Sequence, residues 1–203
     1  MKIGVLAAQG AFIEHIEALK KLGVDTVPVR LPEQLADLDG LIIPGGESTS
    51  ISKLMDAYHL SEGIREMSRK GLPIFGTCAG MIILAGNITD GQEVKNLGLM
   101  DISVRRNAFG RQNESFEADI SMPAIGKEPF HGVFIRAPFI EETNGKTEVL
   151  GRLENGTIVA AREGNLLVTA FHPELTDDLR FHRYFIEMVR KAREAAAEKA
   201  GKV

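Results

Sequence analysis

The stretch Pro73-Ile74-Phe75-Gly76-Thr77-Cys78-Ala79-Gly80-Met81 decides the fold. It predicts a short buried strand, a tight turn and a helix over about 79–86, with the only cysteine of the chain at the turn. Gly76 and Gly80 flank Cys78 at the spacing of a nucleophile elbow, where a sharp turn leaves room for small residues only. Because the amides at the start of the following helix favour a thiolate, we expect Cys78 to be a nucleophile rather than a buried apolar residue.

Composition is that of an ordinary globular protein. The 203 residues are 44% hydrophobic and 26% charged, and the net charge of −4 argues against binding nucleic acid through bulk charge. A single cysteine allows no internal disulfide and fits the cytoplasm. The sequence has no apolar run long enough for a membrane span and no spacing typical of metal ligands, so we expect no membrane, metal or cofactor. We expect one domain over 1–203, with a helical tail at about 191–203 that frays.

The first half of the chain alternates between strands and helices. Apolar runs predict strands over 2–8, 24–30, 40–43 and before Cys78, and helical spacing predicts helices over 12–22, 49–59 and 61–70. Pro28 suggests an edge position or a bend for the second strand. This order predicts an α/β fold whose mainly parallel central sheet is flanked by helices, with ligands bound beyond the carboxyl ends of the strands.

The second half predicts short strands separated by turns. These strands are expected over 99–106, 116–122, 129–136, 148–153, 157–162 and 166–171. We expect them to be antiparallel, and either to extend the sheet or to form a small separate layer. A last helix is expected over 177–198.

A glycine pair follows the third predicted strand, in Pro44-Gly45-Gly46-Glu47-Ser48-Thr49-Ser50. The simplest interpretation is a loop into a helix, with Ser48 or Thr49 as the N-cap. A phosphate loop is a poor fit because no Gly-Lys-Ser/Thr follows. A Gly-Gly pair at the carboxyl end of a strand can also turn backbone amides toward a ligand, as an oxyanion hole requires.

One of the five histidines has the setting of a catalytic base. His172 follows the apolar run 166–171 and precedes Pro173-Glu174. Proline restricts the residue before it to extended backbone, in which residues two apart face the same side. We therefore expect Glu174 to orient His172, and the two to form a triad with Cys78. The other histidines, expected to be structural or solvated, are His15, His59, His131 and His182.

Three motifs resemble the class I, triad-type glutamine amidotransferases: G-T-C-A-G at 76–80, P-G-G-E-S at 44–48 and F-H-P-E at 171–174. A closer resemblance, over about residues 2–190, is to the glutaminase subunits of pyridoxal 5′-phosphate synthase. It is carried by A-Q-G-A at 8–11, R-N-x-F-G-R-Q at 106–112, S-F-E-A-D at 115–119, F-I-R-A-P at 134–138 and H-P-E-L-T at 172–176. The sequence departs from that pattern at Ala7-Ala8 and near 87–96.

The resemblance implies an enzyme that hydrolyses L-glutamine to glutamate and ammonia through a glutamyl thioester. Cys78 would be the nucleophile, His172 the general base and acid, and Glu174 the orienting group. The amides of Gly46 and Ala79 would form the oxyanion hole. The glutamine pocket implied by the resemblance consists of Gly46, Glu47, Ser48, Arg106, Ile135 and Arg136.

The resemblance also implies a partner. Ammonia would pass to a synthase subunit in a large hetero-oligomer that makes pyridoxal 5′-phosphate (vitamin B6), with Gln9 and Gly10 as the candidate contact. We expect this partner to activate the chain, because the Gly45-Gly46 peptide can rotate at low cost and so form or break the oxyanion hole. Two alternatives stay open: a glutaminase that feeds a different synthase, and a catalytically silent module that regulates a partner. The intact triad residues favour an enzyme.

Overall fold

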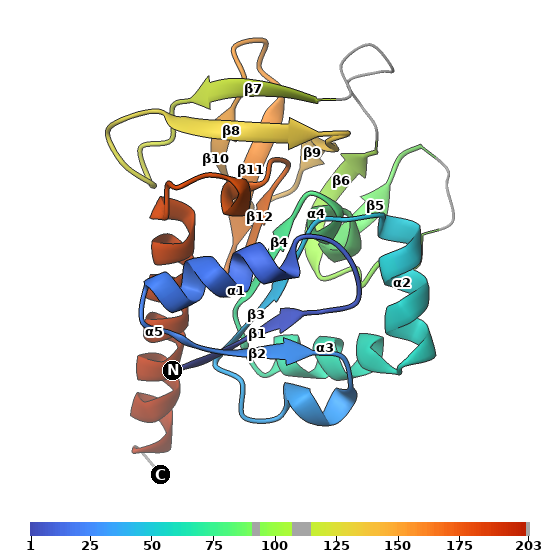
Figure 1. Ribbon diagram of the computed structural model, residues 1–203, viewed down its shortest axis with the longest axis vertical. Helices are drawn as coiled ribbons and strands as arrows, with labels where there is room; N and C mark the ends of the chain where they lie inside the picture. Colours follow the sequence, from blue (N-terminus) through green and yellow to red (C-terminus); the bar gives the residue numbers. More distant parts are fainter. Residues whose placement is uncertain (91–93, 107–114, 202–203) are drawn as a thin grey trace.

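The computed structural model describes residues 1–90, 94–106 and 115–201. The strands are β1 (Lys2–Leu6), β2 (Asp25–Val29), β3 (Gly40–Ile43), β4 (Ile74–Thr77), β5 (Ala85–Ile88), β6 (Met100–Arg105), β7 (Ser115–Ile120), β8 (Phe130–Ile135), β9 (Phe139–Thr143), β10 (Glu148–Arg152), β11 (Ile158–Glu163) and β12 (Leu166–Thr169). The helices are α1 (Phe12–Lys21), α2 (Ser48–Ala57), α3 (Leu60–Arg69), α4 (Ala79–Leu84) and α5 (Arg180–Ala200), with 3₁₀ turns η1 (Pro32–Leu35) and η2 (Pro173–Leu175). Ten strands form one mixed sheet flanked by helices, and β7 and β8 form a separate hairpin (Figure 1).

The core of the sheet is parallel, as the alternating first half predicts. Its strands run in the order β2-β1-β3-β4-β12, all parallel to their neighbours. β2 is the edge strand, so the position expected for Pro28 is confirmed. The prediction for 166–171 was wrong in part, because β12 pairs antiparallel with β11 but parallel with β4. Each residue of β4 and β12 is buried, which is typical of strands covered on both faces.

The second half both extends the sheet and forms a separate layer. β11, β9 and β6 continue the sheet by antiparallel pairing, and β10 pairs with β11. Three features differ from the predictions. Only antiparallel pairing was expected for the strand over 99–106, but β6 pairs parallel with β5 and antiparallel with β9. The helix expected over 79–86 ends at Leu84, because Ala85 takes an extended ψ of 146° and begins β5, which pairs parallel with β6. The strand β9 was not predicted, since its two glutamates interrupt the apolar pattern.

Alternation along β4 decides which helix covers which face. Phe75 contacts the rings of His15 in α1 and Phe185 in α5, at centroid distances of 6.2 and 5.6 Å. Gly76 faces the other side, where a Cβ would lie 2.8 Å from the Leu84 side chain of α4. Because successive residues of a strand point to opposite faces, α1 and α5 cover one face and α4 the other.

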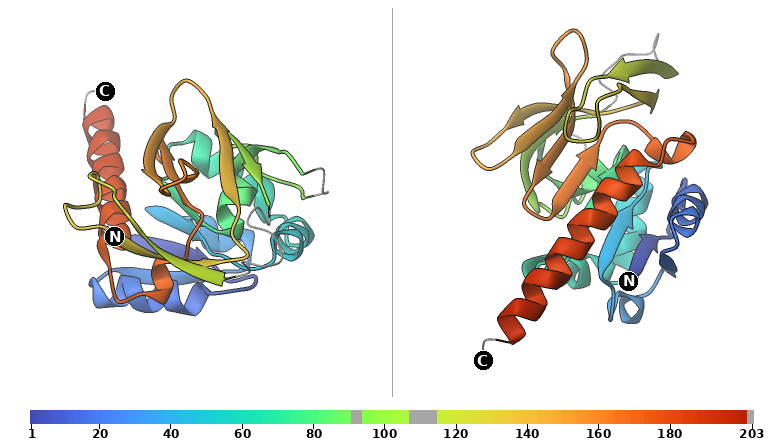
Figure 2. Two further views of the ribbon diagram at one scale, coloured as in Figure 1. Left: turned by 90° about the horizontal axis from the view of Figure 1, so that it is seen from above. Right: turned by 90° about the vertical axis from the view of Figure 1, so that its left-hand side faces the viewer.

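Buried phenylalanines join the β7–β8 hairpin to the rest of the molecule. Phe130 and Phe134 of β8 contact Phe171 after β12, each at a centroid distance of 5.5 Å, and Phe130 also meets Phe181 of α5 at 4.9 Å. The Phe134–Phe171 and Phe130–Phe181 pairs are edge-to-face, and such pairs add to the free energy gained by burying apolar area. The hairpin therefore lies across the end of the sheet above α5 (Figure 2).

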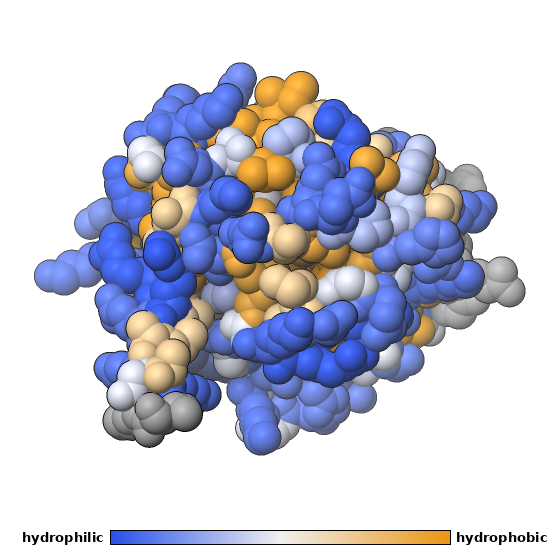
Figure 3. Space-filling view, turned by 90° about the horizontal axis from the view of Figure 1, so that it is seen from below, coloured by the Kyte–Doolittle hydropathy of each residue, from blue (hydrophilic) through white to orange (hydrophobic). Residues whose placement is uncertain are grey.

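The last helix begins at Arg180, later than the expected residue 177, because the chain first forms η2. The fraying of its end stays a prediction. In the described part of the chain, no helix is long and apolar enough to cross a membrane. Viewed from below, hydrophilic residues dominate the rim of the surface and apolar residues gather toward its middle (Figure 3).

Candidate active site

Cys78 lies at a strained turn between β4 and α4. Its φ of 50° and ψ of −105° are unusual for a residue with a side chain, and such strain is concentrated at functional sites. The need for small neighbours has a direct steric cause. A Cβ on Gly80 would lie 2.0 Å from the carbonyl oxygen of Ile43, and one on Gly76 would lie 2.6 Å from the backbone of Gly80. The turn therefore has the geometry that the G-x-C-x-G spacing predicts.

Parallel pairing of β12 with β4 brings His172 to the elbow. Thr169 is in register with Thr77, and the Cys78 amide donates to the Thr169 carbonyl at 2.8 Å. The chain then leaves the sheet, and the His172 amide donates to the carbonyl of Val133 in β8 at 2.9 Å. Cys78 and His172 thus meet at the carboxyl ends of neighbouring strands, although 94 positions separate them in the sequence.

Glu174 contacts His172 as expected, but for a different reason. The distance from His172 Nδ1 to Glu174 Oε1 is 2.7 Å. The extended backbone predicted for this segment is wrong, because Pro173–Leu175 is the 3₁₀ turn η2 and proline occupies its first position. The tight turn, rather than strand alternation, folds the carboxylate back onto the imidazole.

Burial and hydrogen bonding oppose each other at this pair. Burial alone would lower the pKa of His172, but hydrogen bonds with Cys78 and Glu174 outweigh it and raise the pKa to about 10. Burial would raise the pKa of Glu174, but His15 and His172 beside it lower the pKa instead. Nδ1 of His172 is engaged by Glu174, which leaves Nε2 for the thiol. This arrangement stabilises an imidazolium between the Glu174 carboxylate and Cys78.

A cavity of about 540 Å³ opens at this point, large enough for an amino acid. All the site residues expected from the sequence line it except Glu174, which lies behind His172. Ile82 and Leu175 also line it. Neither was assigned a role from the sequence, because both are apolar, although Leu175 belongs to the motif at 172–176. Within the described ranges, no group of three or more His, Cys, Asp or Glu side chains is placed to hold a metal ion.

The loop after β3 contacts both the elbow and the Gln9 turn. The N-cap of α2 is Glu47, rather than Ser48 or Thr49 as expected. Burial would raise the pKa of Glu47, but hydrogen bonds from Ser50 and Thr49 lower it to about 2. The Glu47 amide donates to Gln9 Oε1 at 3.2 Å.

The Gly45 carbonyl faces the turn that contains Gly10. A Cβ on Gly10 would lie 1.8 Å from that carbonyl oxygen, so only glycine fits there. A Cβ on Gly45 would lie 2.3 Å from the His172 ring, so this position is closed to side chains as well. The peptide with the proposed oxyanion amide is therefore in direct contact with the Gln9-Gly10 turn.

Two neighbouring arginines differ in their surroundings. Arg106 lines the cavity with a side chain that is 9% exposed, and its Nη2 lies 3.9 Å from Glu47 Oε1. Its Nη1 is buried and has no hydrogen-bond partner among the described residues. Arg105 instead pairs with Glu141 at 2.7 Å in an exposed position. The rest of the 106–112 motif lies outside the described residues.

The end of β8 forms one wall of the cavity, next to Cys78. The Ile135 carbonyl lies 3.8 Å from Cys78 Sγ, and the Ile135 side chain is partly exposed in the cavity. Arg136 follows with a φ of 42°, which is strained for a residue with a side chain. The end of β8 and the residue after it thus supply Ile135 and Arg136, two of the pocket residues that the resemblance implies.

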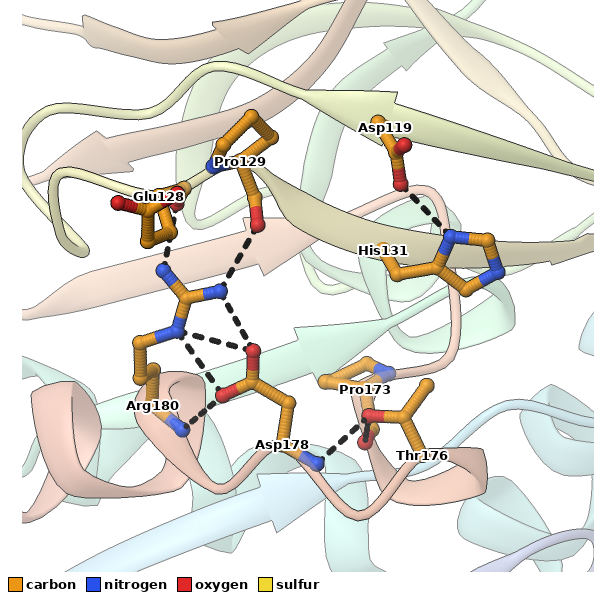
Figure 4. Close-up of polar contacts among 8 residues, drawn as sticks. All are labelled: Asp119, Glu128, Pro129, His131, Pro173, Thr176, Asp178 and Arg180. Carbon is orange, nitrogen blue, oxygen red and sulfur yellow. Dashed lines mark hydrogen bonds and ion pairs between the residues drawn. The ribbon is translucent and has the colours of Figure 1, made fainter.

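An arginine fixes the segment that carries Glu174 to the hairpin (Figure 4). Arg180 donates to the carbonyls of Glu128 and Pro129 at 2.6 and 2.9 Å, and also to the Asp178 carboxylate. Asp178 in turn donates its amide to Thr176 Oγ1 at 3.3 Å, just after η2. The position of η2 relative to β8 therefore depends on charge-assisted bonds at the start of α5.

The sequence did not predict the surroundings of two other histidines. His15 and His182 are fully buried, and His15 Nε2 lies 3.4 Å from Glu174 Oε2. His15 occupies the same helical stripe as Phe12 and Leu19, which was the available signal for burial. Nothing in the sequence indicates its contact with Glu174.

The fold and the cysteine–histidine–glutamate arrangement define an α/β protein of the glutamine amidotransferase type. The chain belongs to the SNO glutamine amidotransferase family, whose model matches residues 5–191. It is 57% identical over 191 residues to the pyridoxal 5′-phosphate synthase subunit PdxT of Carboxydothermus hydrogenoformans, covering 94% of this chain and 99% of that protein. The subunit of the same name from Moorella thermoacetica is 57% identical over 189 residues, covering 93% and 100% of the two chains.

Solved structures agree on the fold. A crystal structure of a glutamine amidotransferase superposes with a TM-score of 0.87 at 49% identity, covering 92% of this chain and 98% of that one. The structure of PurLQS from Thermotoga maritima superposes with a TM-score of 0.67 at 16% identity, covering 92% and 97%. The second similarity concerns the fold alone.

Proposed function

We propose that this chain is the glutamine-hydrolysing subunit of a pyridoxal 5′-phosphate synthase. One observation carries the hydrolytic part: Cys78 lies at a strained elbow against the buried His172–Glu174 pair, in a cavity of amino-acid size. The name shared by relatives that match over nearly their whole length supports the synthase. The single domain over 1–203 and a cytoplasmic location belong to the same proposal. A lone cysteine without a disulfide partner fits a reducing compartment.

The reaction follows from the placement of the groups. The Cys78 thiolate adds to the carboxamide carbon of glutamine, and the amides of Ala79 and Gly46 stabilise the oxyanion. His172 gives its Nε2 proton to the departing nitrogen, so that ammonia leaves and a glutamyl thioester remains. His172 then takes a proton from water, whose oxygen attacks the thioester. Glutamate leaves and the thiolate is restored, while Glu174 holds the imidazole in place throughout.

Arg106 is the residue that we propose to bind the substrate α-carboxylate. Arg106 lines the cavity together with Glu47 and Ser48, and its buried Nη1 has no hydrogen-bond partner among the described residues. A charge-assisted bond to the substrate would give this guanidinium a partner. We expect Arg106→Ala to raise KM for glutamine by roughly 10- to 150-fold, the value of a lost charged hydrogen bond. Arg105→Ala is the matched control, because that side chain pairs with Glu141 outside the cavity. Steady-state ammonia release measures both, and the opposite ranking would contradict the assignment.

The synthase partner is proposed to dock at the Gln9-Gly10 turn in a large hetero-oligomer and to activate the enzyme. Gln9 holds the Glu47 amide, and Gly10 touches the Gly45 carbonyl, so a partner at this turn acts directly on the oxyanion loop. A Gly-Gly peptide rotates at low cost, and losing one oxyanion donor lowers kcat about 10²- to 10³-fold.

Ammonia release from glutamine tests the function. The purified chain is titrated with the synthase partner, and Cys78→Ala is the matched inactive variant, since alanine fits a site that already favours small residues. We expect little release without partner, strong release with it and none from Cys78→Ala. Release by folded Cys78→Ala would overturn the nucleophile, whereas full release without partner would overturn the activation alone.

A further inference from the structure

A second pair of buried histidines lies directly behind Glu174. His15 in α1 and His182 in α5 are both fully buried, with His15 Nδ1 and His182 Nε2 3.0 Å apart. His15 Nε2 lies 3.4 Å from Glu174 Oε2 and 3.2 Å from Thr77 Oγ1. The two helices pack on the same face of the sheet, next to η2 (Figures 1 and 2). A continuous chain of polar side chains therefore runs from the elbow into the protein interior.

The two carboxylate oxygens of Glu174 have different surroundings. Oε1 accepts from His172, whereas Oε2 is buried without a hydrogen-bond partner in the part of the chain that the structure describes. The 3.4 Å to His15 Nε2 is longer than a good hydrogen bond, so this contact is mainly electrostatic. A buried carboxylate oxygen needs a donor nearby, and His15 is the group in that position.

The hydrogen-bond partners of His15 favour one of its two neutral tautomers. If His15 Nε2 carries the proton, this N–H can donate to Thr77 Oγ1 at 3.2 Å and also lies 3.4 Å from Glu174 Oε2, while His182 Nε2–H donates to His15 Nδ1. Of the four ring nitrogens of the two histidines, only His182 Nδ1 then has no partner among the described residues, and in this tautomer it carries a lone pair and no proton. The other tautomer would set a lone pair of His15 against the carboxylate and leave a buried N–H of His182 unpaired. The first arrangement avoids both penalties.

Both histidines are neutral in this arrangement. Burial lowers the pKa of His15, and the effect of the Glu174 carboxylate does not reverse it. Burial and His15 lower the pKa of His182 to about 3. The network therefore places a neutral N–H donor, and not a second cation, beside Glu174.

We propose that His15 is a positioning residue of the active site, whose Nε2–H supports Glu174 Oε2 while His172 engages Oε1. His182 selects the tautomer that makes this possible. The proposal rests on the triad of the proposed function. It adds a residue from α1, the helix that directly follows the Gln9-Gly10 turn.

The role of His15 predicts a particular change in pH dependence. Without the Nε2–H, burial of Glu174 is less opposed and its carboxyl takes up a proton at higher pH. The His172 imidazolium then loses its partner, and with it the thiolate of Cys78. Since His15 does not line the cavity, its loss should lower kcat and leave KM nearly unchanged.

Two substitutions separate this role from packing. The His15→Asn amide reaches only the Nδ1 position, so it keeps the contact with His182 and loses the one with Glu174. The longer His15→Gln amide reaches the Nε2 position and restores a donor to Glu174. His182→Asn is the matched buried control, because His182 is one residue removed from the carboxylate and Glu174 itself still favours the Nε2–H tautomer of His15.

The rate of Cys78 alkylation by iodoacetamide as a function of pH reports the thiolate directly, since the chain has a single cysteine. We expect His15→Asn to move the low-pH limb of this alkylation profile to higher pH by about one unit, which is a tenfold change in protonation. Glutamine hydrolysis with the synthase partner present should show about tenfold lower kcat and KM within twofold. His15→Gln should restore both profiles, and His182→Asn should shift them less than His15→Asn.

His172→Asn separates failure of this proposal from failure of the triad. If His172→Asn changes the alkylation profile but folded His15→Asn does not, His15 has no positioning role. Equal shifts for His15→Asn and His182→Asn, or no rescue by His15→Gln, would also overturn the proposal, because packing would then explain the effect. An unchanged profile in His172→Asn would overturn the triad itself.

Discussion

Two histidine–carboxylate pairs in this protein have the same hydrogen-bond length and different surroundings. His172 Nδ1 lies 2.7 Å from Glu174 Oε1, and its side chain is 8% exposed. His131 Nδ1, on the β8 strand of the hairpin, lies 2.7 Å from Asp119 Oδ1, and its side chain is 52% exposed (Figure 4). Its Nε2 is also engaged, by Glu117 at 2.8 Å.

The geometry of a histidine–carboxylate pair does not by itself make the histidine a catalytic base. Hydrogen bonds with Asp119 and Glu117 raise the pKa of His131, but solvent screens the pair and both ring nitrogens are occupied. His172 uses Nδ1 for Glu174 and keeps Nε2 for Cys78. Because the pair is buried, the positive charge of His172 is stabilised by Cys78 and Glu174 and not by solvent. A free nitrogen, a nucleophile and exclusion of water distinguish the active pair.

Removing each imidazole tests this distinction most strongly. His172→Asn should lower kcat for glutamine hydrolysis by roughly 10⁶-fold, by analogy with a serine triad. His131→Asn should leave kcat within twofold, because His131 does not line the cavity. Both are measured with the synthase partner present. Near-wild-type activity of His172→Asn would break the comparison.

Removing the charge of each carboxylate should give a smaller contrast. Glu174→Gln should lower kcat by roughly 10⁴-fold, since the carboxylate orients the imidazole but moves no proton. Asp119→Asn on the hairpin should leave kcat unchanged. An equal loss for Glu174→Gln and His172→Asn would fit a triad that acts as a unit, whereas an inactive Asp119→Asn would show that the exposed pair has a role in the reaction.

The pH dependence of stability should also separate the pairs. The folded pKa of His172 is raised to about 10, so its contribution is fully present below the unfolded value near 6.5 and is lost as pH rises through the folded value. The difference in unfolding free energy between wild type and His172→Asn should therefore shrink from pH 6 to pH 10. Urea denaturation at several pH values measures it, and a difference that grows with pH would contradict the sign.

The smallest expected effect is at His131. Its pKa is raised, so its contribution has the same sign, present below about 6.5 and lost at higher pH. Exposure makes this contribution weak and sensitive to salt. The loss of melting temperature in His131→Gln should be small at pH 6 and smaller still in 1 M salt. Salt-independent destabilisation would mean that packing, and not charge, explains the His131 effect.

Sequence reasoning succeeded where local chemistry dictates structure. The G-x-C-x-G spacing predicted a turn that only small residues fit, and Gly80 shows why, since any side chain there would strike the Ile43 carbonyl. Prediction from the sequence failed where two different local backbone arrangements give the same side-chain contact. His172 and Glu174 meet through a 3₁₀ turn rather than an extended segment, because proline is as favourable at the start of a turn as after a strand.

The alternating strands and helices of the first half and the elbow at Cys78 were determined by the sequence alone, because periodicity and short spacings encode them. The folded structure was needed to show that Arg106, which the resemblance implies, lines the cavity and that Arg105 does not, since the residue types alone do not distinguish two adjacent arginines. It also decided that His15 reaches Glu174. That contact joins residues 159 positions apart, and its existence depends on which helices pack on one face of a sheet, which no local pattern records.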